Sequence, residues 1–307
     1  MPAKPHGLPG SDRTPPSAQS TNARAIRRAI VLAPIVLTAC QPAVLDPQGV
    51  VGIADKTILI DSLAIMLAIV VPTVAATFAF AWWFRASNTK AAYLPNFDYS
   101  GRLELIVWAI PLLVIMLLGG VAWIGSHDLD PARPLPSSQK PLEVDVVSLD
   151  WKWLFIYPDQ GVASINQLIA PVGVPLHLRI TSASVLNVFF VPRLGSEIYA
   201  MNGMTSQLNL QADEPGRYHG LAAHFSGDGF SDMDFELHAV PPAEFSDWAA
   251  NARAAGEPTL DAASYRQLLV QTQNVKPYTY RAVLPGLFAA IVNQKLPPGL
   301  GPQVTEK

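Results

Sequence analysis

Cysteine is almost absent from this sequence. Among its 307 residues there is one cysteine, Cys40. A single thiol forms no disulfide within a chain, and it cannot complete a cysteine-rich zinc site, an iron–sulfur cluster or a copper–thiolate centre. Any chemistry in the rest of the chain therefore depends on other side chains.

Charge is scarce as well. Charged residues make up 15% of the chain and hydrophobic residues 50%, which excludes a disordered chain and argues against an ordinary soluble globule. With a formal net charge of -3 and a pI near 6.1, the chain offers no basic surface, so nucleic acid is not an expected partner. The acidity is concentrated in residues 126–240, with 13 Asp/Glu against 6 Lys/Arg, which we interpret as a solvated face.

The N-terminal residues 1–39 predict a leader and a lipoprotein signal peptide. Three arginines among residues 24–28 precede a short apolar run that ends in Leu-Thr-Ala-Cys at residues 37–40. This order of basic residues, apolar core and small residues marks a cleavage point. A cysteine directly after that point resembles a bacterial lipoprotein signal, in which the cysteine carries the lipid. We expect lipid on Cys40; the alternative is a buried cysteine in an uncleaved signal anchor.

Two long apolar stretches predict membrane spans. Residues 58–84 and 103–125 each provide the roughly 20 apolar residues that a helix needs to cross a bilayer. The loop between them, about 85–102, carries three Lys/Arg against one Asp, so the positive-inside rule puts it in the cytoplasm. We expect a two-helix transmembrane hairpin over residues 58–125, preceded by an extracytoplasmic N-terminal segment, 40–57.

Short strands are predicted after a Pro-rich linker, residues 126–141. Residues 142–240 contain alternating, β-branched and aromatic runs separated by Gly, Pro and Asp or Asn, which is typical of an all-β sandwich. From 241 to 307 the sequence predicts an aromatic-rich helical extension. The fold class is therefore membrane-anchored α+β. The expected strands are 142–149, 153–157, 175–180, 185–191, 206–210 and 234–240, and the expected helices of the extension are 245–255, 261–271 and 285–294.

Two indoles flank Lys152 in the sequence Trp151-Lys152-Trp153. Because side chains alternate along a strand, we expect both indoles on the same strand face. The interpretation that we favour is packing in the core or against a partner. The aromatic residues of the extension are expected to dock or cap, without catalysis. His177, His219, His224 and His238 form no HxH or HxxxH pair, which favours loop or surface histidines over a metal site.

Local motifs add a resemblance to this organisation. The run from Ser184 to Met201, followed by Gly216–Tyr218 and by Gly227–Met233, resembles subunit II of a haem–copper terminal oxidase in its quinol-oxidising, cytochrome bo-type branch. The resemblance implies a cupredoxin-like sandwich in a proton-translocating ubiquinol oxidase that reduces oxygen to water. It also implies subunit I, with subunits III and IV, as partners, together with membrane lipid and with ubiquinol reached through subunit I.

The resemblance also indicates where copper would be held. The cytochrome c-oxidising branch of the family binds two coppers in this sandwich, through an early His and a Cys-x-x-x-Cys-x-x-x-His-x-x-Met loop. The corresponding positions here are Asn187, Ala222, Ser226, Phe230 and Met233, with His224 between Ala222 and Ser226. Only Met233 is retained as a ligand type, and without thiolates such a centre cannot assemble. We therefore expect no cofactor in this chain, with haems and copper in subunit I.

Glu104 is the candidate for a proton entrance. It opens the second apolar stretch in a Glu-x-x-x-Trp-x-x-Pro run, residues 104–111. This run is similar to the start of the same helix in the family, where the glutamate marks the entrance of a proton channel into subunit I. The alternative is a carboxylate that reaches to the membrane surface without such a role.

The favoured interpretation is a lipid-anchored, non-redox subunit II of a ubiquinol oxidase that braces subunit I. Two alternatives stay open at the level of sequence. One is subunit II of a cytochrome c oxidase, and the other is a non-enzymatic membrane lipoprotein with a β-sandwich binding domain. The expected location is the bacterial inner membrane, as a multi-pass protein with the β domain and both mature termini on the periplasmic side.

Overall fold

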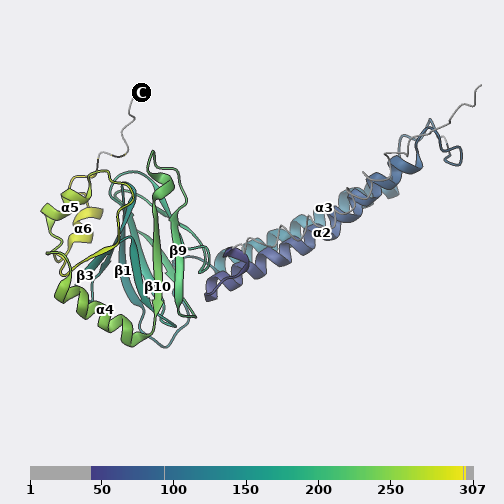
Figure 1. Cartoon of the computed structure of the whole chain (residues 1–307). Coiled ribbons are helices and arrows are strands. Elements are labelled where there is room, and N and C mark those ends of the chain that lie inside the picture. Colours follow the sequence, from purple (N-terminus) through teal and green to yellow (C-terminus); the bar gives the residue numbers. More distant parts are fainter. Residues whose placement is uncertain (1–42, 93, 300, 302–307) are drawn as a thin grey trace, which may run out of the picture. The chain divides into compact units, whose positions relative to one another are not determined.

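A computed structural model describes residues 43–92, 94–299 and 301 of the chain. The predicted leader, residues 1–39, and Cys40 lie outside the described residues. The described part contains two long helices, a β-sandwich and a C-terminal extension of short helices (Figure 1).

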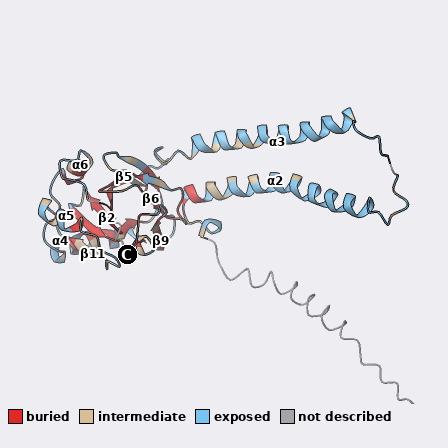
Figure 2. Cartoon of the chain, turned by 90° about the horizontal axis from the view of Figure 1, so that it is seen from above, coloured by how far each residue is buried: buried red, intermediate tan, exposed pale blue. Residues whose placement is uncertain are grey.

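The two long helices are α2, Val50–Trp83, and α3, Gly101–Asp128. Among the described residues these two are long and apolar enough to cross a membrane, with mean hydropathy of 2.4 and 2.6 in their most apolar windows, and neither window is buried. Figure 2 shows them exposed along nearly their whole length. A helix that is apolar all round is stable only against lipid or other proteins, so both predicted spans are confirmed as candidate membrane helices.

Helix α2 begins earlier than the first predicted span because its first turn packs on the sandwich. Val51 is 8% exposed, and the backbone N–H of Gly52 donates to the Leu194 carbonyl at 3.0 Å. A Cβ at Gly52 would lie 3.3 Å from the Arg193 carbonyl oxygen and 2.9 Å from Pro47, so the close approach favours glycine there. These contacts extend the helix into the segment expected to precede the membrane.

The sandwich consists of two sheets. Among the described residues, one sheet has six strands in the order β11-β3-β2-β1-β5-β8, and the other has five in the order β4-β10-β9-β6-β7. The β1–β5 and β4–β10 pairs are parallel, and the other ladder pairs are antiparallel. The strands are β1 Leu142–Leu149, β2 Lys152–Tyr157, β3 Val162–Ile165, β4 Gln167–Pro171, β5 Leu176–Ser182, β6 Asn187–Phe190, β7 Ile198–Ala200, β8 Ser206–Leu210, β9 Gly216–Ala222, β10 Asp234–Val240 and β11 Tyr278–Tyr280.

Strands β1, β8 and β10 have the predicted bounds, and the bounds of β2, β5 and β6 differ from the predicted ones by one or two residues. Strands β3, β4, β7 and β9 were not predicted from the sequence. Strand β9 illustrates the reason, because its two glycines interrupt the strand pattern. A Cβ at Gly220 would lie 2.1 Å from Cζ of Phe235, so this glycine marks a close cross-strand approach rather than a turn.

Aromatic rings from both sheets fill the space between them. Trp153 and Phe155 of β2 meet Phe189 of β6 and Phe235 of β10, with ring centroids 5.0–6.4 Å apart. All four side chains are at most 2% exposed. Offset and edge-to-face contacts of this kind add to the free energy gained by burial alone.

The C-terminal extension contains α4, Pro242–Ala255, α5, Ala262–Leu268, and α6, Leu287–Val292. The three helices occur where they were predicted, but the bounds of each differ from the predicted bounds by one to three residues. The extension was expected to contain helices, and it also contains a strand. Tyr278–Tyr280 form β11, which pairs with β3 and adds an edge strand to the sandwich. No helix was predicted over these residues, and the strand was missed because strand pairing is decided by the partner strand.

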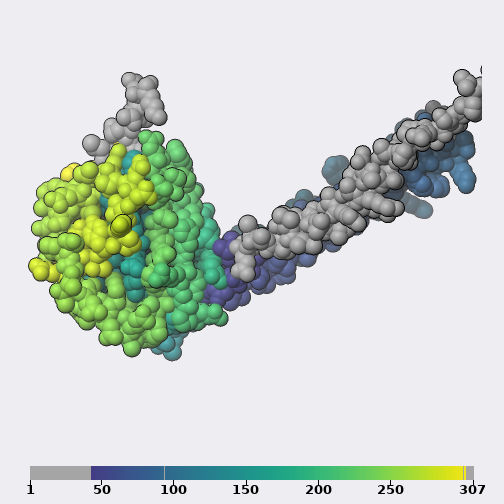
Figure 3. All heavy atoms as spheres, in the orientation of Figure 1, coloured from purple at the N-terminus to yellow at the C-terminus, as the bar shows by residue number. Residues whose placement is uncertain are grey.

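The extension covers the outer face of the six-stranded sheet (Figures 1 and 3). Its buried residues form a second core with the side chains of β1 and β2 that point away from the first core. Asp261 begins α5 by accepting hydrogen bonds from the backbone N–H groups of Ala263 and Ser264, as an N-cap residue does. The contributors to this core from the extension include Leu260, Tyr265, Leu287, Phe288 and Ile291.

Lys152 ties the extension to β2. Its side chain is 2% exposed, and Nζ donates to the Val270 carbonyl at 2.8 Å and to Thr272 Oγ1 at 2.6 Å. Burial lowers the pKa of Lys152 from 10.5 to about 8, although the nearby Asp150 acts in the opposite direction. A charged group held in this way costs free energy that is relieved when it loses its proton.

We predict a pH-dependent stability that Lys152→Met abolishes. Between pH 8 and 10.5 the unfolded chain binds a proton on Lys152 that the folded chain does not, so the free energy of unfolding rises with pH across this window. The measurement is the Tm of the detergent-solubilised chain, followed by tryptophan fluorescence. The Tm of the native chain should rise relative to that of Lys152→Met from pH 8 to 10. Lys295→Met, at an exposed lysine, is the control and should follow the native chain; parallel curves for Lys152→Met would contradict the assignment.

Candidate functional site

Positions that correspond to the family's copper ligands lie together at one end of the sandwich. Asn187 begins β6 and Met233 directly precedes β10, yet the Asn187 side-chain amide donates to the Met233 sulfur at 3.1 Å. Both residues are at most 2% exposed. Ala222, at the end of β9, joins them through its backbone N–H, which donates to the Met233 carbonyl at 3.0 Å. The strands thus bring residues 46 positions apart into contact.

The loop from Ala223 to Asp232 closes over this contact. Short-range backbone hydrogen bonds and a 3₁₀ turn at Phe230–Asp232 fix its last part. The indole of Trp151 fills the space beneath, and its Nε1 donates to the Ser226 carbonyl at 3.0 Å. A Cβ at Gly229 would lie 2.3 Å from the indole, so the loop rests directly on the ring.

Trp151 was expected on the strand. It lies instead in the turn before β2, with a φ of 65°. Its indole and that of Trp153 nevertheless belong to the same core cluster, so the expectation of core packing is confirmed. The left-handed turn brings Trp151 under the loop, and a period-two pattern cannot show this. Lys152 was likewise missed. The unusual feature that could have indicated both is a lysine between two tryptophans in an otherwise apolar strand.

His224 does not join the buried contact. It is exposed, and its ring lies 6.5 Å from that of Tyr199. The neighbouring Phe225 is 73% exposed. Ser226 is buried, and its hydroxyl has no hydrogen-bond partner within the described part of the chain. The residues that gather here therefore offer an amide, a thioether and a hydroxyl.

This donor set does not fit a binuclear copper centre. Copper in such a centre requires thiolate and imidazole ligands, whereas an amide and a neutral thioether are weak ligands. Across residues 43–92, 94–299 and 301, no group of three or more His, Cys, Asp or Glu is arranged to hold a metal ion. Instead, the buried Asn187 amide finds its hydrogen-bond acceptor in the Met233 sulfur.

The other three candidate histidines, His177, His219 and His238, lie on strands rather than in loops. His177 Nδ1 is 3.0 Å from Asn209 Oδ1 across the β5–β8 pair. His238 Nε2 is 2.7 Å from Glu236 Oε2, and this hydrogen bond holds the pKa of Glu236 below its ordinary value. His219 faces Glu236 across the β9–β10 pair. Cross-strand polar pairs of this kind stabilise a sheet surface.

Glu104 lies in the first turn of α3. Its backbone N–H donates to the Ser100 carbonyl at 3.0 Å, which closes that turn. The side chain is exposed, and its carboxylate makes no hydrogen bond or ion pair with any residue that the structure describes. The carboxylate is therefore free to meet water or a partner subunit where the helix begins.

Two protein families match the C-terminal half of the chain. Residues 159–240 match the family described as Cytochrome C oxidase subunit II, periplasmic domain, and residues 254–299 match the COX Aromatic Rich Motif. The first match covers the sandwich from β3 to β10, and the second covers α5, β11 and α6.

Relatives match nearly the whole chain. Cytochrome bo(3) ubiquinol oxidase subunit 2 of Pseudomonas aeruginosa is 44% identical over 264 residues, which is 86% of this chain and 80% of the relative. Ubiquinol oxidase subunit 2 of Acetobacter aceti is 46% identical over 272 residues, 88% of each chain. The chain belongs to the ubiquinol oxidase subunit 2 family. The resemblance predicted from the sequence is confirmed, and an unrelated membrane lipoprotein is excluded.

Solved structures also resemble parts of this chain. The periplasmic domain of cytochrome oxidase subunit II from Bradyrhizobium japonicum is 23% identical, with a TM-score of 0.36, over 38% of this chain and 98% of that domain. The predicted fold class, with two apolar helices, a cupredoxin-like sandwich and C-terminal helices, is confirmed for this family member.

We predict that Met233→Leu destabilises this ubiquinol oxidase subunit 2. Leucine has a similar volume, but the buried Asn187 amide then loses its acceptor, which should lower the free energy of unfolding by about 1 kcal/mol. The midpoint of denaturant unfolding measures the change. Met204→Leu is the matched control, because Met204 is 55% exposed and should tolerate leucine. Equal midpoints for the two variants would show that the amide–sulfur contact contributes nothing.

Proposed function

We propose that this chain is the non-redox subunit II of a proton-translocating terminal ubiquinol oxidase that reduces oxygen to water. The buried Asn187–Met233 contact supports the proposal most directly. It occupies the place where a copper-binding subunit II needs imidazole and thiolate groups. A side-chain amide that donates to a thioether leaves neither group available to bind copper.

The route of electrons follows from this chemistry. A one-electron protein donor such as cytochrome c must deliver its electron to a metal near the outer surface. Without such a metal, a membrane-soluble quinol is the suitable donor, because it can approach from within the bilayer and reduce haem in subunit I. Haems and the oxygen-reducing copper then belong to subunit I. This chain braces subunit I, and subunits III and IV are its further partners in the complex.

Two features support a periplasmic sandwich. Residues 85–102, which are the loop between α2 and α3 and the first two residues of α3, carry three Lys/Arg against one Asp, which favours the cytoplasm for this loop. Asp46, before α2, accepts a 2.5 Å hydrogen bond from Arg193 of the sandwich, so the residues before the first helix and after the second share one side of the membrane. In a bacterial inner membrane that side is the periplasm, and both mature termini lie there.

A lipid on Cys40 is part of this proposal. Cys40 precedes by three residues the short 3₁₀ helix Ala43–Leu45, which leads toward α2. An acyl chain would contribute about 0.8 kcal/mol per buried methylene and act as an anchor beside the two helices. The lipid would therefore belong on the same side as the sandwich.

Glu104 is proposed to help form the proton entrance. It lies at the loop end of α3, the cytoplasmic end in this topology, and its carboxylate is exposed. A carboxylate at the edge of an apolar span can exchange protons with water and pass them to groups deeper in a partner subunit. Arg102 lies on the same turn and raises the local positive charge.

We expect Glu104→Gln to slow the oxidase without preventing its assembly. The amide keeps the size of the side chain but cannot release a proton. Quinol-dependent oxygen uptake should therefore fall by up to about a hundredfold, which is the smallest rate effect typical of a positioned proton-transfer group. Haem content reports assembly. Asp98→Asn, which removes another exposed carboxylate from the loop, is the control and should be fully active. Full turnover of Glu104→Gln would end the proposed role.

Copper analysis tests the absence of a redox centre. The full chain, produced without its partner subunits and purified in mild detergent, should contain well under one copper per chain, because its only thiol is Cys40. Elemental analysis and electron paramagnetic resonance are the measurements, with a copper-binding subunit II as positive control. Stoichiometric, spin-coupled copper would instead support a cytochrome c oxidase.

A further inference from the structure

A cavity of about 370 Å³ lies where α3 leads into the sandwich. Its walls come from the start of α2, the end of α3, the linker that follows and strand β8. Val51, Leu129, Leu135 and Leu208 make much of the lining apolar, together with prolines of the linker. The linker thus contributes to a pocket in addition to connecting α3 to the sandwich.

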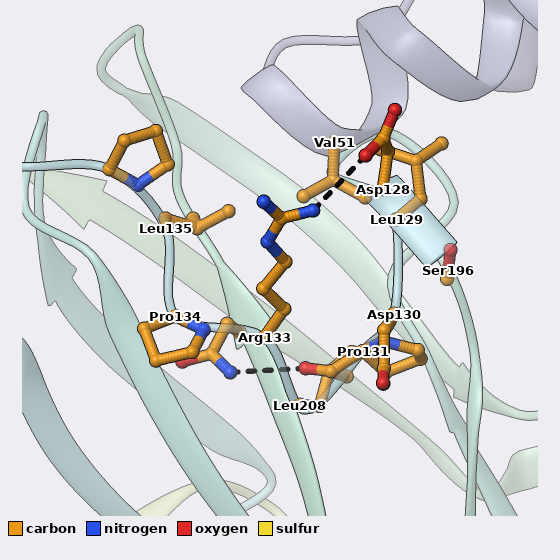
Figure 4. Close-up of a pocket in the computed structure, with 12 residues that line it drawn as sticks. Val51, Asp128, Leu129, Asp130, Pro131, Arg133, Pro134, Leu135, Ser196 and Leu208 are labelled. Atoms are coloured by element: carbon orange, nitrogen blue, oxygen red, sulfur yellow. Dashed lines mark hydrogen bonds and ion pairs between the residues drawn. The ribbon is translucent and has the colours of Figure 1, made fainter. Parts of the chain in front are cut away.

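Three charged residues lie in the same cavity. Arg133 reaches toward Asp128, and their Nη1 and Oδ1 atoms are 3.1 Å apart, with both side chains more than half exposed. Figure 4 shows the guanidinium between that carboxylate and Leu135. Asp130 accepts a hydrogen bond from the backbone of Ala132 with one oxygen only.

Arg133 has donors to spare. A guanidinium carries five N–H groups. Within the described ranges, the side chain of Arg133 hydrogen bonds only through Nη1, to Asp128 and to the His127 carbonyl at 3.4 Å. Its Nε and Nη2 are therefore available for an anionic oxygen, and a planar guanidinium suits a phosphate better than any other side chain does.

The depth of the cavity matches the headgroup layer of a membrane. Trp123 lies near the end of α3 and is 68% exposed, as is typical of an indole at the boundary of the hydrocarbon. Asp128 is five residues further on, about 7.5 Å along a helix axis. Each headgroup layer is about 5–7.5 Å thick, so Asp128, and Arg133 paired with it, lie at the outer edge of this layer.

We propose that this cavity binds the headgroup of a zwitterionic phospholipid that carries a primary ammonium, of the phosphatidylethanolamine type. Arg133 binds the phosphate, and the carboxylates of Asp128 and Asp130 accept hydrogen bonds from the ammonium. The apolar walls contact the glycerol and the first methylenes of the acyl chains. The bound lipid fixes the linker at the membrane surface.

The charges select among headgroups. Two carboxylates against one guanidinium disfavour a lipid with a net negative charge, such as phosphatidylglycerol. A choline headgroup has no N–H to donate, and proteins bind quaternary ammonium groups mainly through aromatic rings. The described residues that line the cavity include no aromatic side chain. A primary ammonium next to a phosphate is therefore the best match.

Native mass spectrometry of the intact oxidase tests the proposal. The complex is stripped of lipid in detergent and titrated with phosphatidylethanolamine, phosphatidylglycerol, phosphatidylcholine or ubiquinone. The Arg133→Gln complex loses one charge-assisted contact to the lipid phosphate. It should therefore bind phosphatidylethanolamine about tenfold more weakly at this site than the native complex, or show one bound lipid fewer. Phosphatidylglycerol and phosphatidylcholine should show no such difference between the two complexes.

Controls separate binding from folding. Arg217→Gln removes an exposed arginine of β9 whose nearest carboxylate, on Glu236, is 3.9 Å away, and its binding should equal that of the native complex. Arg133→Lys keeps a cation and should retain part of the affinity. Haem content and Tm report that the variants assemble. Unchanged lipid binding by an assembled Arg133→Gln complex, equal binding of all three lipids at this site, or displacement of the lipid by ubiquinone would each overturn the proposal.

Discussion

Strand β2 has no face in contact with water, and the rest of the extramembrane structure depends on this. Trp153 and Phe155 point into the space between the sheets, whereas Leu154 and Ile156 point into the extension, and none is more than 4% exposed. An antiparallel sheet can leave one face solvated. Here the extension covers that face, so the sandwich and the extension form one packed unit, and the loop over Trp151 rests on the turn that begins the same strand.

The parts of the fold that the sequence predicts well are those whose pattern is local. Helices α2 and α3 have long apolar runs, and β1, β8 and β10 have regular strand patterns between clear breakers. The missed elements depend on distant partners. Strand β9 contains Gly220 because a ring from β10 lies against it, and β11 exists because β3 offers it an edge.

The site was predictable in composition but only partly in geometry. Family spacing alone pointed to Asn187 and Met233 as corresponding positions, and the structure brings these two into contact. The spacing of the family's copper-binding motif could not predict which contacts replace the lost copper ligands. The amide–sulfur hydrogen bond, the indole beneath the loop and the exposure of His224 all depend on strand register and on the left-handed turn at Trp151.

The first turn of α2 has a consequence for how this protein is made. Backbone N–H groups of Gln48 and Gly52 donate to the Arg193 and Leu194 carbonyls, so a segment that leaves the ribosome before either helix finds its partners more than 140 residues later. Those partners exist only after the second helix and the first strands of the sandwich have been synthesised. Until then the donors of the early segment are hydrogen-bonded to water, and folding of the sandwich is what allows that segment to be buried.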